Sequence, residues 1–189
     1  MRLSALSLLV AALAASGLAG CTPPPPPAPV AEAPPPPPPK PEPPTQNAPM
    51  CVRTPEKAAF DVSALKSNLM VTAVTCKTED RYNAFIRQFQ PTLATNEKAL
   101  GGYFSRAYGK RALAQQDDYI TSLANAQSQL GIKYGSLFCA QNVGMFDEVM
   151  AIKSGADLPA FAANKPIQQA LAIQECPPPP PPAPAKKKP

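Results

Sequence analysis

Side chains that usually carry acid–base and nucleophilic chemistry are scarce in this sequence. There is no histidine, which excludes the usual catalytic triads, the commonest metal ligand and the usual general base. Carboxylates remain, and a glycan-cleaving enzyme needs two of them about 5–10 Å apart across a cleft. The candidates by residue type are Glu97, Asp117, Asp118, Asp147 and Glu148. Adjacent helical side chains diverge by about 100°, so Asp117 and Asp118 could not flank the same glycosidic bond. We therefore expect these carboxylates to form charged helix surface. We also expect no metal and no cofactor.

The stretch YFSRAYGKR brings aromatic and cationic side chains together near one predicted helix end. Its members are Tyr103, Arg106, Tyr108, Lys110 and Arg111. Aromatic rings mixed with cations can stack on sugars or grip an acidic group, which makes this stretch a candidate binding patch. In the alternative interpretation, the cations offset a helix dipole and the tyrosines belong to the core. The next helix is amide-rich, which suits a wet interface or an exposed face: Gln115, Gln116, Asn125, Gln127, Gln129.

Residues 1–20 are built like a secretory signal. Arg2 gives a short positive start, residues 3–18 are mostly Leu and Ala, and two small residues precede Cys21. This order is typical of a signal peptide. The apolar run of about 16 residues is shorter than the roughly 20 that span a bilayer as a helix.

The tetrapeptide LAGC, residues 18–21, resembles the lipobox of bacterial lipoproteins. The resemblance implies that the chain is cut before Cys21 and that the thiol and the new amino terminus are acylated. Three acyl chains exceed the two signals needed for stable membrane anchoring. Thr22, rather than Asp, follows the cysteine, which in Gram-negative lipoproteins implies the outer membrane, with the domain facing the periplasm. The alternatives are an ordinary signal peptide with a stray cysteine and a surface-exposed domain.

The cysteine count fits such a cut. Of the five cysteines, removal of Cys21 leaves four, which in an oxidising compartment are expected to form two disulfides. Cys76 and Cys139 lie on the apolar stripes of two predicted helices, so we pair them, which leaves Cys51 with Cys176. Four cysteines allow three connectivities, and a four-thiolate metal site would need closer Cys-x-x-Cys spacing.

Proline divides the chain into parts. Of the 28 prolines, 16 lie in residues 23–49 and eight in residues 177–189. Proline-rich chains form semi-rigid spacers in the polyproline II conformation, so a linker of residues 22–49 could reach about 85 Å. The alternative is a docking ligand for an aromatic groove. We expect a signal peptide at 1–20, the lipidated cysteine and an unfolded linker at 21–49, a domain at 50–176 and a disordered tail at 177–189.

Positive charge is concentrated at the C-terminal end of the chain. The net charge is +5, but residues 50–176 contain 13 basic and 11 acidic side chains. Lys186, Lys187 and Lys188 supply the rest and could contact an anionic surface such as peptidoglycan or lipid headgroups; the alternative is a solvated end that aids solubility. Because the domain has no broad basic excess, we do not expect nucleic acid as a partner.

The pattern of residues 50–176 predicts an all-α fold, a bundle of about five helices stapled by the disulfides and flanked by the disordered proline-rich segments. Asp61 is expected to cap the first helix, Pro91 to break or kink the second, and Gly131 to end a later one. We expect short final helices to start at Pro159 and Pro166. The expected long helices cover 61–76, 78–90, 92–108, 111–130 and 136–154.

These features predict a lipid-anchored, non-enzymatic envelope protein. Its helical domain would serve as a binding or structural module, with peptidoglycan or an envelope protein as partner and the lipid bilayer holding Cys21. The alternative is a peptidoglycan-acting enzyme that uses paired carboxylates. The linker and the tail are expected to leave the domain from one side, because the Cys51–Cys176 disulfide would hold its two ends together.

Overall fold

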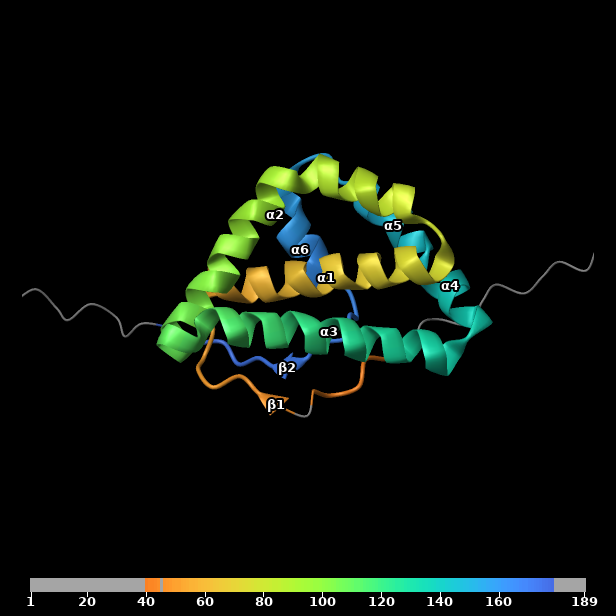
Figure 1. The fold of residues 1–189 in the computed structure, drawn as a ribbon. Helices are drawn as coiled ribbons and strands as arrows, with labels where there is room; N and C mark the ends of the chain where they lie inside the picture. The colour runs from red at the N-terminus through yellow and green to blue at the C-terminus, as the bar shows by residue number, and fades with distance from the viewer. Residues whose placement is uncertain (1–39, 45, 179–189) are drawn as a thin grey trace, which may run out of the picture. The chain divides into compact units, whose positions relative to one another are not determined.

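The computed structural model describes residues 40–44 and 46–178. The predicted signal peptide, Cys21, most of the linker and Lys186, Lys187 and Lys188 lie outside the described residues. The described part is mostly helical, with three long helices followed by short ones (Figure 1). Its elements are β1 (Gln46–Asn47), α1 (Thr54–Cys76), α2 (Glu79–Tyr108), η1 (Gly109–Arg111), α3 (Ala112–Tyr134), α4 (Ser136–Asn142), α5 (Gly144–Met150), η2 (Gly155–Asp157), α6 (Leu158–Ala163) and β2 (Leu171–Ala172).

Helix α1 is the centre of the domain and packs against α2, α3 and α6. It begins at Thr54, seven residues before the expected cap at Asp61, so that expectation was wrong. Pro55 suits the first helical turn because it needs no backbone N–H donor there. The Glu56 carboxylate accepts the Arg53 backbone N–H at 2.7 Å, which satisfies a donor that the start of a helix leaves unpaired.

Helix α2 is continuous through Pro91, where the sequence predicted two helices. The kink permitted by the prediction is present: Figure 1 shows α2 bent near its middle into two arms. Pro91 lacks the backbone N–H that would donate a hydrogen bond to the carbonyl group four residues earlier. Near the bend, Thr95 Oγ1 donates to the Pro91 carbonyl at 3.0 Å and Asn96 Nδ2 to the Thr92 carbonyl at 2.8 Å.

Three further helix boundaries differ from the sequence prediction. Helix α3 continues past Gly131 and ends before Gly135, whose φ of +51° is a positive value that glycine adopts more easily than other residues. The predicted single helix after Ser136 is divided at Val143 into α4 and α5. Pro159 lies in the first turn of α6, as expected, but the segment after Pro166 is not helical and leads to β2.

The two arms of α2 cover two clusters of buried side chains on opposite halves of α1. One cluster joins Leu65 and Leu69 of α1 to Phe85, Phe146 and other residues of α2, α5 and α6. The other joins α1, the second arm of α2 and α3: Val52, Ala59, Phe60, Ala64, Leu100, Tyr103, Phe104, Tyr119, Leu123. The bend near the middle of α2 therefore lets one helix close both halves of the core.

Both cysteine pairs are those that the sequence predicted. Cys51 is joined to Cys176 with a Cα–Cα distance of 4.8 Å, and Cys76 to Cys139 with 5.6 Å. All four residues are half-buried. The first bridge closes the two ends of the helical domain, and the second ties the end of α1 to α4.

The segment before Cys51 is folded onto the domain, and we name residues 40–44 and 46–49 the strap. Strand β1 of the strap pairs in parallel with β2, and the Ala48 N–H donates to the Ala172 carbonyl at 2.9 Å. The expectation that residues 22–49 carry no fold was therefore wrong for the end of that range, because Gln46–Ala48 retain the backbone donors that proline lacks.

The strap also changes where the linker meets the domain. Because β1 and β2 are parallel, the strap runs along the domain in the same direction as residues 168–176 (Figure 1). Glu42 lies beside Gln168 and Lys133, whereas the chain leaves the domain beyond Cys176. The two flanks are therefore attached at different places, contrary to the expected exit from one side.

Candidate functional site

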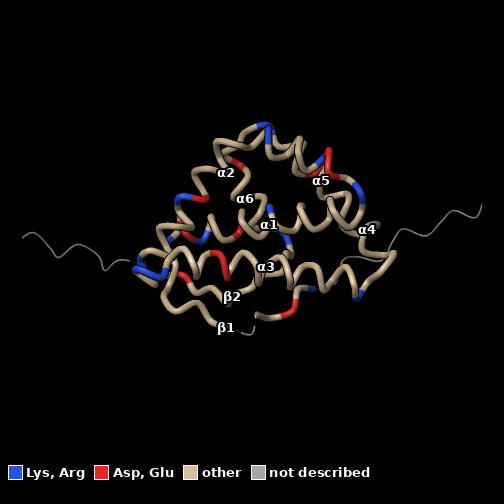
Figure 2. Tube along the Cα trace, viewed as in Figure 1, with Lys and Arg blue, Asp and Glu red and all other residues tan. Residues whose placement is uncertain are grey.

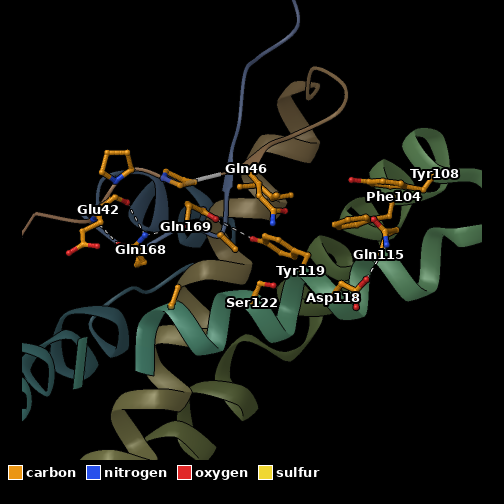
Figure 3. A pocket seen from close by; sticks show the side chains of 15 residues that line it. Glu42, Gln46, Phe104, Tyr108, Gln115, Asp118, Tyr119, Ser122, Gln168 and Gln169 are labelled. Carbon is orange, nitrogen blue, oxygen red and sulfur yellow. Dashed lines mark hydrogen bonds between the residues drawn. The ribbon is translucent and has the colours of Figure 1, made fainter. Parts of the chain in front are cut away.

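A cleft of about 360 Å³ lies between the strap and α3, and we name it the strap cleft. Figure 3 shows its walls: Glu42 and Gln46 from the strap, Gln168 and Gln169 before β2, and a row of side chains from α2 and α3. The fold brings these segments together because β1 pairs with β2 beside α3. The lining combines amides, hydroxyls, one carboxylate from each wall and aromatic rings.

Aromatic side chains form one end of the strap cleft. The rings of Phe104 and Tyr108 are stacked, with centroids 5.8 Å apart and an angle of 16° between their planes. Phe104 is buried and Tyr108 is half-buried, so the outer ring is the more accessible one. A partly exposed aromatic face of this kind can stack on the apolar face of a sugar or on a planar group.

Tyr119 forms the buried floor between the two ends of the cleft. Its ring packs edge-on against Phe60 at 5.1 Å, and its hydroxyl group donates to Gln169 Oε1 at 3.2 Å. Burial raises the pKa of this hydroxyl group, so Tyr119 stays neutral and acts as a hydrogen-bond donor. Gln169 is held in turn by its Nε2 donation to the Phe60 carbonyl at 3.3 Å.

The α3 wall is polar and open. Gln115 Nε2 donates to Asp118 Oδ2 at 3.0 Å, one turn along the exposed face, and Ser122 follows on the same face. Asp118 and Ser122 are exposed. This wall can therefore offer acceptors and a hydroxyl group to a bound polar molecule without a large desolvation cost.

The candidate binding patch at residues 103–111 is divided by the structure. Tyr103 is fully buried and donates its hydroxyl hydrogen bond to the Met50 carbonyl at 3.2 Å. Tyr108 lines the strap cleft, whereas Lys110 and Arg111 are exposed in η1. The five residues do not form one surface, because successive positions of α2 point to different sides of the helix.

Arg106 belongs to a structural contact that we name the clamp, made by Cys51, Glu56, Tyr103 and Arg106. The guanidinium group donates to Glu56 Oε2 at 2.5 Å and to the Cys51 carbonyl at 2.9 Å, and it lies 5.4 Å from the centre of the Tyr103 ring. Burial of Glu56 acts to raise the pKa of its carboxyl group, but the hydrogen bonds from Arg106 and Arg53 outweigh it and the pKa is lowered. The clamp fixes the chain beside the Cys51–Cys176 disulfide.

The five candidate catalytic carboxylates do not meet at one cleft. Only Asp118 lines the strap cleft. Three of the others have a cationic partner: Glu97 with Lys66, Asp147 with Arg81 and Glu148 with Lys165. In Figure 2 the charged positions of the described residues are spread over several elements, with both signs interspersed.

The most organised polar side chains were not singled out from the sequence. Gln168 and Glu42 lie 126 positions apart, and no local pattern indicated that they meet. The amide-rich sequence of α3 suits a wet interface or an exposed face, but Gln127 is fully buried and is not part of an exposed face. Its Nε2 donates to the Ala64 and Gln168 carbonyls, each at 3.1 Å.

Comparison with known protein families, curated proteins and solved structures found no match for this chain. The fold and the site therefore define only a class: a small helical domain with two disulfides and a polar, aromatic-ended cleft. None of the described helices is both long enough and apolar enough to cross a membrane. In the part of the chain that the structure describes, no cluster of three or more cysteine or acidic side chains could hold a metal ion.

Proposed function

We propose that this protein is a bacterial lipoprotein anchored in the outer membrane through acylated Cys21, with its domain in the periplasm. The observation that carries the proposal is how the five cysteines are distributed between disulfides and the LAGC tetrapeptide. The two disulfides account for four of the five cysteines, and the fifth ends the LAGC tetrapeptide directly before a proline-rich linker. Disulfides also suit an oxidising compartment such as the periplasm.

In this proposal residues 22–39 and the tail from residue 179 are disordered, semi-rigid spacers around a helical bundle. Their proline content supports this, since such chains have few apolar side chains to bury and lack many backbone donors. The linker would hold the domain away from the lipid, and Lys186, Lys187 and Lys188 would contact an anionic surface.

The domain would act as a binding module without catalysis, and the strap cleft is its proposed binding surface. Amide, hydroxyl and carboxylate groups beside the half-buried Tyr108 ring suit a ligand made of sugar and amide groups, and peptidoglycan has that chemistry. The enzyme alternative receives less support, because the candidate carboxylates are spread over the surface and mostly paired with cations.

The anchor is tested by labelling growing cells with palmitate and separating their membranes. The parent protein should carry label and sediment with the outer membrane, whereas a Cys21→Ser variant should carry none. Equal label and equal membrane association of the variant would contradict the anchor. Protease treatment of intact cells tests orientation, because a periplasmic domain should be protected until the outer membrane is opened.

Binding is tested by sedimentation with purified peptidoglycan. Tyr108→Ala and Asp118→Asn should each weaken binding, whereas Asp117→Asn is the matched control because it removes a neighbouring exposed charge outside the cleft. A chain ending at Cys176 separates the contribution of the tail from that of the cleft. Release of soluble glycan fragments by the parent protein would contradict the non-enzymatic proposal.

A further inference from the structure

Only two residues between positions 34 and 44 have a backbone N–H, because all the others are proline. These two are Lys40 and Glu42. The side-chain amide of Gln168 pairs with both polar backbone groups of Glu42: its Oε1 accepts the Glu42 N–H at 2.8 Å, and its Nε2 donates to the Glu42 carbonyl at 2.8 Å. One side chain therefore recognises one of the few residues in the proline run that can be recognised in this way.

Gln168 is held in position for this contact. It is buried, and its own carbonyl accepts the hydrogen bond from fully buried Gln127. Lys133 adds a second contact from α3, since its Nζ lies 2.7 Å from Glu42 Oε1. The backbone and the charge of Glu42 are therefore recognised by two different side chains of the domain.

Most residues of the strap are nevertheless exposed. Glu42, Pro43 and Gln46 are exposed, and clefts of about 360 Å³ and 490 Å³, both lined by Pro43 and Pro44, run beside the strap. A largely exposed segment with few buried apolar contacts opens at low free-energy cost. The strap also loses little conformational freedom on docking, because proline has already fixed much of its backbone.

We propose that the strap is a reversible latch, an intramolecular peptide ligand of the groove made by Gln168, Lys133 and β2. In the docked state the linker meets the domain beside Lys133. In the released state the chain becomes free as far as Cys51, which lengthens the tether by roughly 30 Å and removes the strap wall of the strap cleft. The consequence for tether length depends on the proposed lipid anchor, whereas docking and release do not.

The latch is tested by hydrogen–deuterium exchange of the full-length protein, read at single amides. The Ala48 N–H, bonded to Ala172, should exchange at least about tenfold faster than the Val52 and Cys176 amides, yet at least about tenfold slower than an unstructured peptide. Val52 and Cys176 are the internal reference because they bond across the same two segments inside the disulfide. Exchange of Ala48 at the Val52 rate would overturn reversibility.

Two proline substitutions form a matched pair for the recognition step. Glu42→Pro removes the N–H and the carboxylate, and it should speed Ala48 exchange by at least about fivefold with Val52 unchanged. Lys40→Pro removes the only other N–H of the proline run and should leave Ala48 unchanged. Equal effects of the two variants, or no effect of Glu42→Pro, would overturn the proposal.

Substitution of Gln168 provides an independent check from the groove side. Gln168→Leu should also speed Ala48 exchange, and the two changes combined should have an effect close to that of Glu42→Pro alone. A peptide of residues 40–48 added in excess should speed Ala48 exchange in the parent protein and have no effect in Gln168→Leu. Additive effects, or equal peptide effects on both proteins, would overturn the assignment of Gln168. Failure of palmitate labelling would leave all these exchange results unaffected.

Discussion

The segment around Cys51 is held to the domain by two contacts, the clamp and the strap, which differ in how exposed their ion pairs are. At the clamp, Arg106 neutralises a carboxylate that is 9% exposed and caps the Cys51 carbonyl. At the strap, Lys133 and Glu42 form an ion pair in which the side chains are 55% and 68% exposed. The same kinds of charged groups therefore form one largely buried ion pair and one largely exposed ion pair. The clamp should matter for global stability, and the strap should matter for local opening with little effect on stability.

The largest expected effect comes from the disulfide beside the clamp. Replacing Cys51 and Cys176 together by Ser should lower the free energy of unfolding by about 5 kcal/mol, because the bridge closes a loop of 125 residues in the unfolded chain. Replacing Cys76 and Cys139, 63 positions apart, should cost slightly less, about 4 kcal/mol. Urea unfolding followed by circular dichroism measures both. A loss below about 1 kcal/mol for the first pair would contradict a role in closing the domain.

Removal of the clamp cation should have the next largest effect. Arg106→Met leaves Glu56 buried without its partner and should lower the free energy of unfolding by about 3 kcal/mol at neutral pH. Arg111→Met is the matched control, because Arg111 is exposed in η1 and should have almost no effect. Comparable losses in the two variants would show that the clamp is no more than a surface contact.

The same pair of proteins tests the pH dependence of the clamp. The lowered pKa of Glu56 means that its contribution is complete above its ordinary value of 4.5 and is lost as the pH falls through the folded-state value. The stability difference between the parent and Arg106→Met should therefore shrink in acid. A constant difference from pH 7 to pH 3 would contradict the ion pair as its source.

The two contacts also differ in how far sequence reasoning could reach them. Apolar spacing predicted a helical domain, and placing Cys76 and Cys139 on core stripes led to both disulfide pairs. The N-terminal start of α1 was readable in principle, since Pro55 and Glu56 are typical of a first helical turn. Gly131 was misleading, because glycine inside a helix costs only about 1 kcal/mol and packing can offset it.

The strap could not have been predicted from local pattern. Proline content predicted a semi-rigid, extended spacer, but its docking involves contacts such as that of the Glu42 N–H with a glutamine 126 residues away. Arg106 shows the same limit, because its sequence neighbours suggested an exposed binding patch, whereas its partners Glu56 and Cys51 lie about 50 residues earlier. Long-range polar pairs carry no periodic signal, so only the fold reveals them.

The smallest expected effect separates the charge of Glu42 from its backbone. Glu42→Gln keeps the N–H and the carbonyl that Gln168 recognises, and it removes only the ion pair with Lys133. In the parent protein, this ion pair lowers the pKa of the Glu42 carboxyl group. The thermal midpoint should not change, and exchange of Ala48 should rise by less than about twofold, well below the effect of Glu42→Pro. Raising the salt concentration should speed Ala48 exchange slightly in the parent protein and not at all in Glu42→Gln, because salt screens an exposed ion pair but not a neutral hydrogen bond. If Glu42→Gln released the strap as fully as Glu42→Pro, the charge rather than the backbone would hold it, and recognition by Gln168 would be secondary.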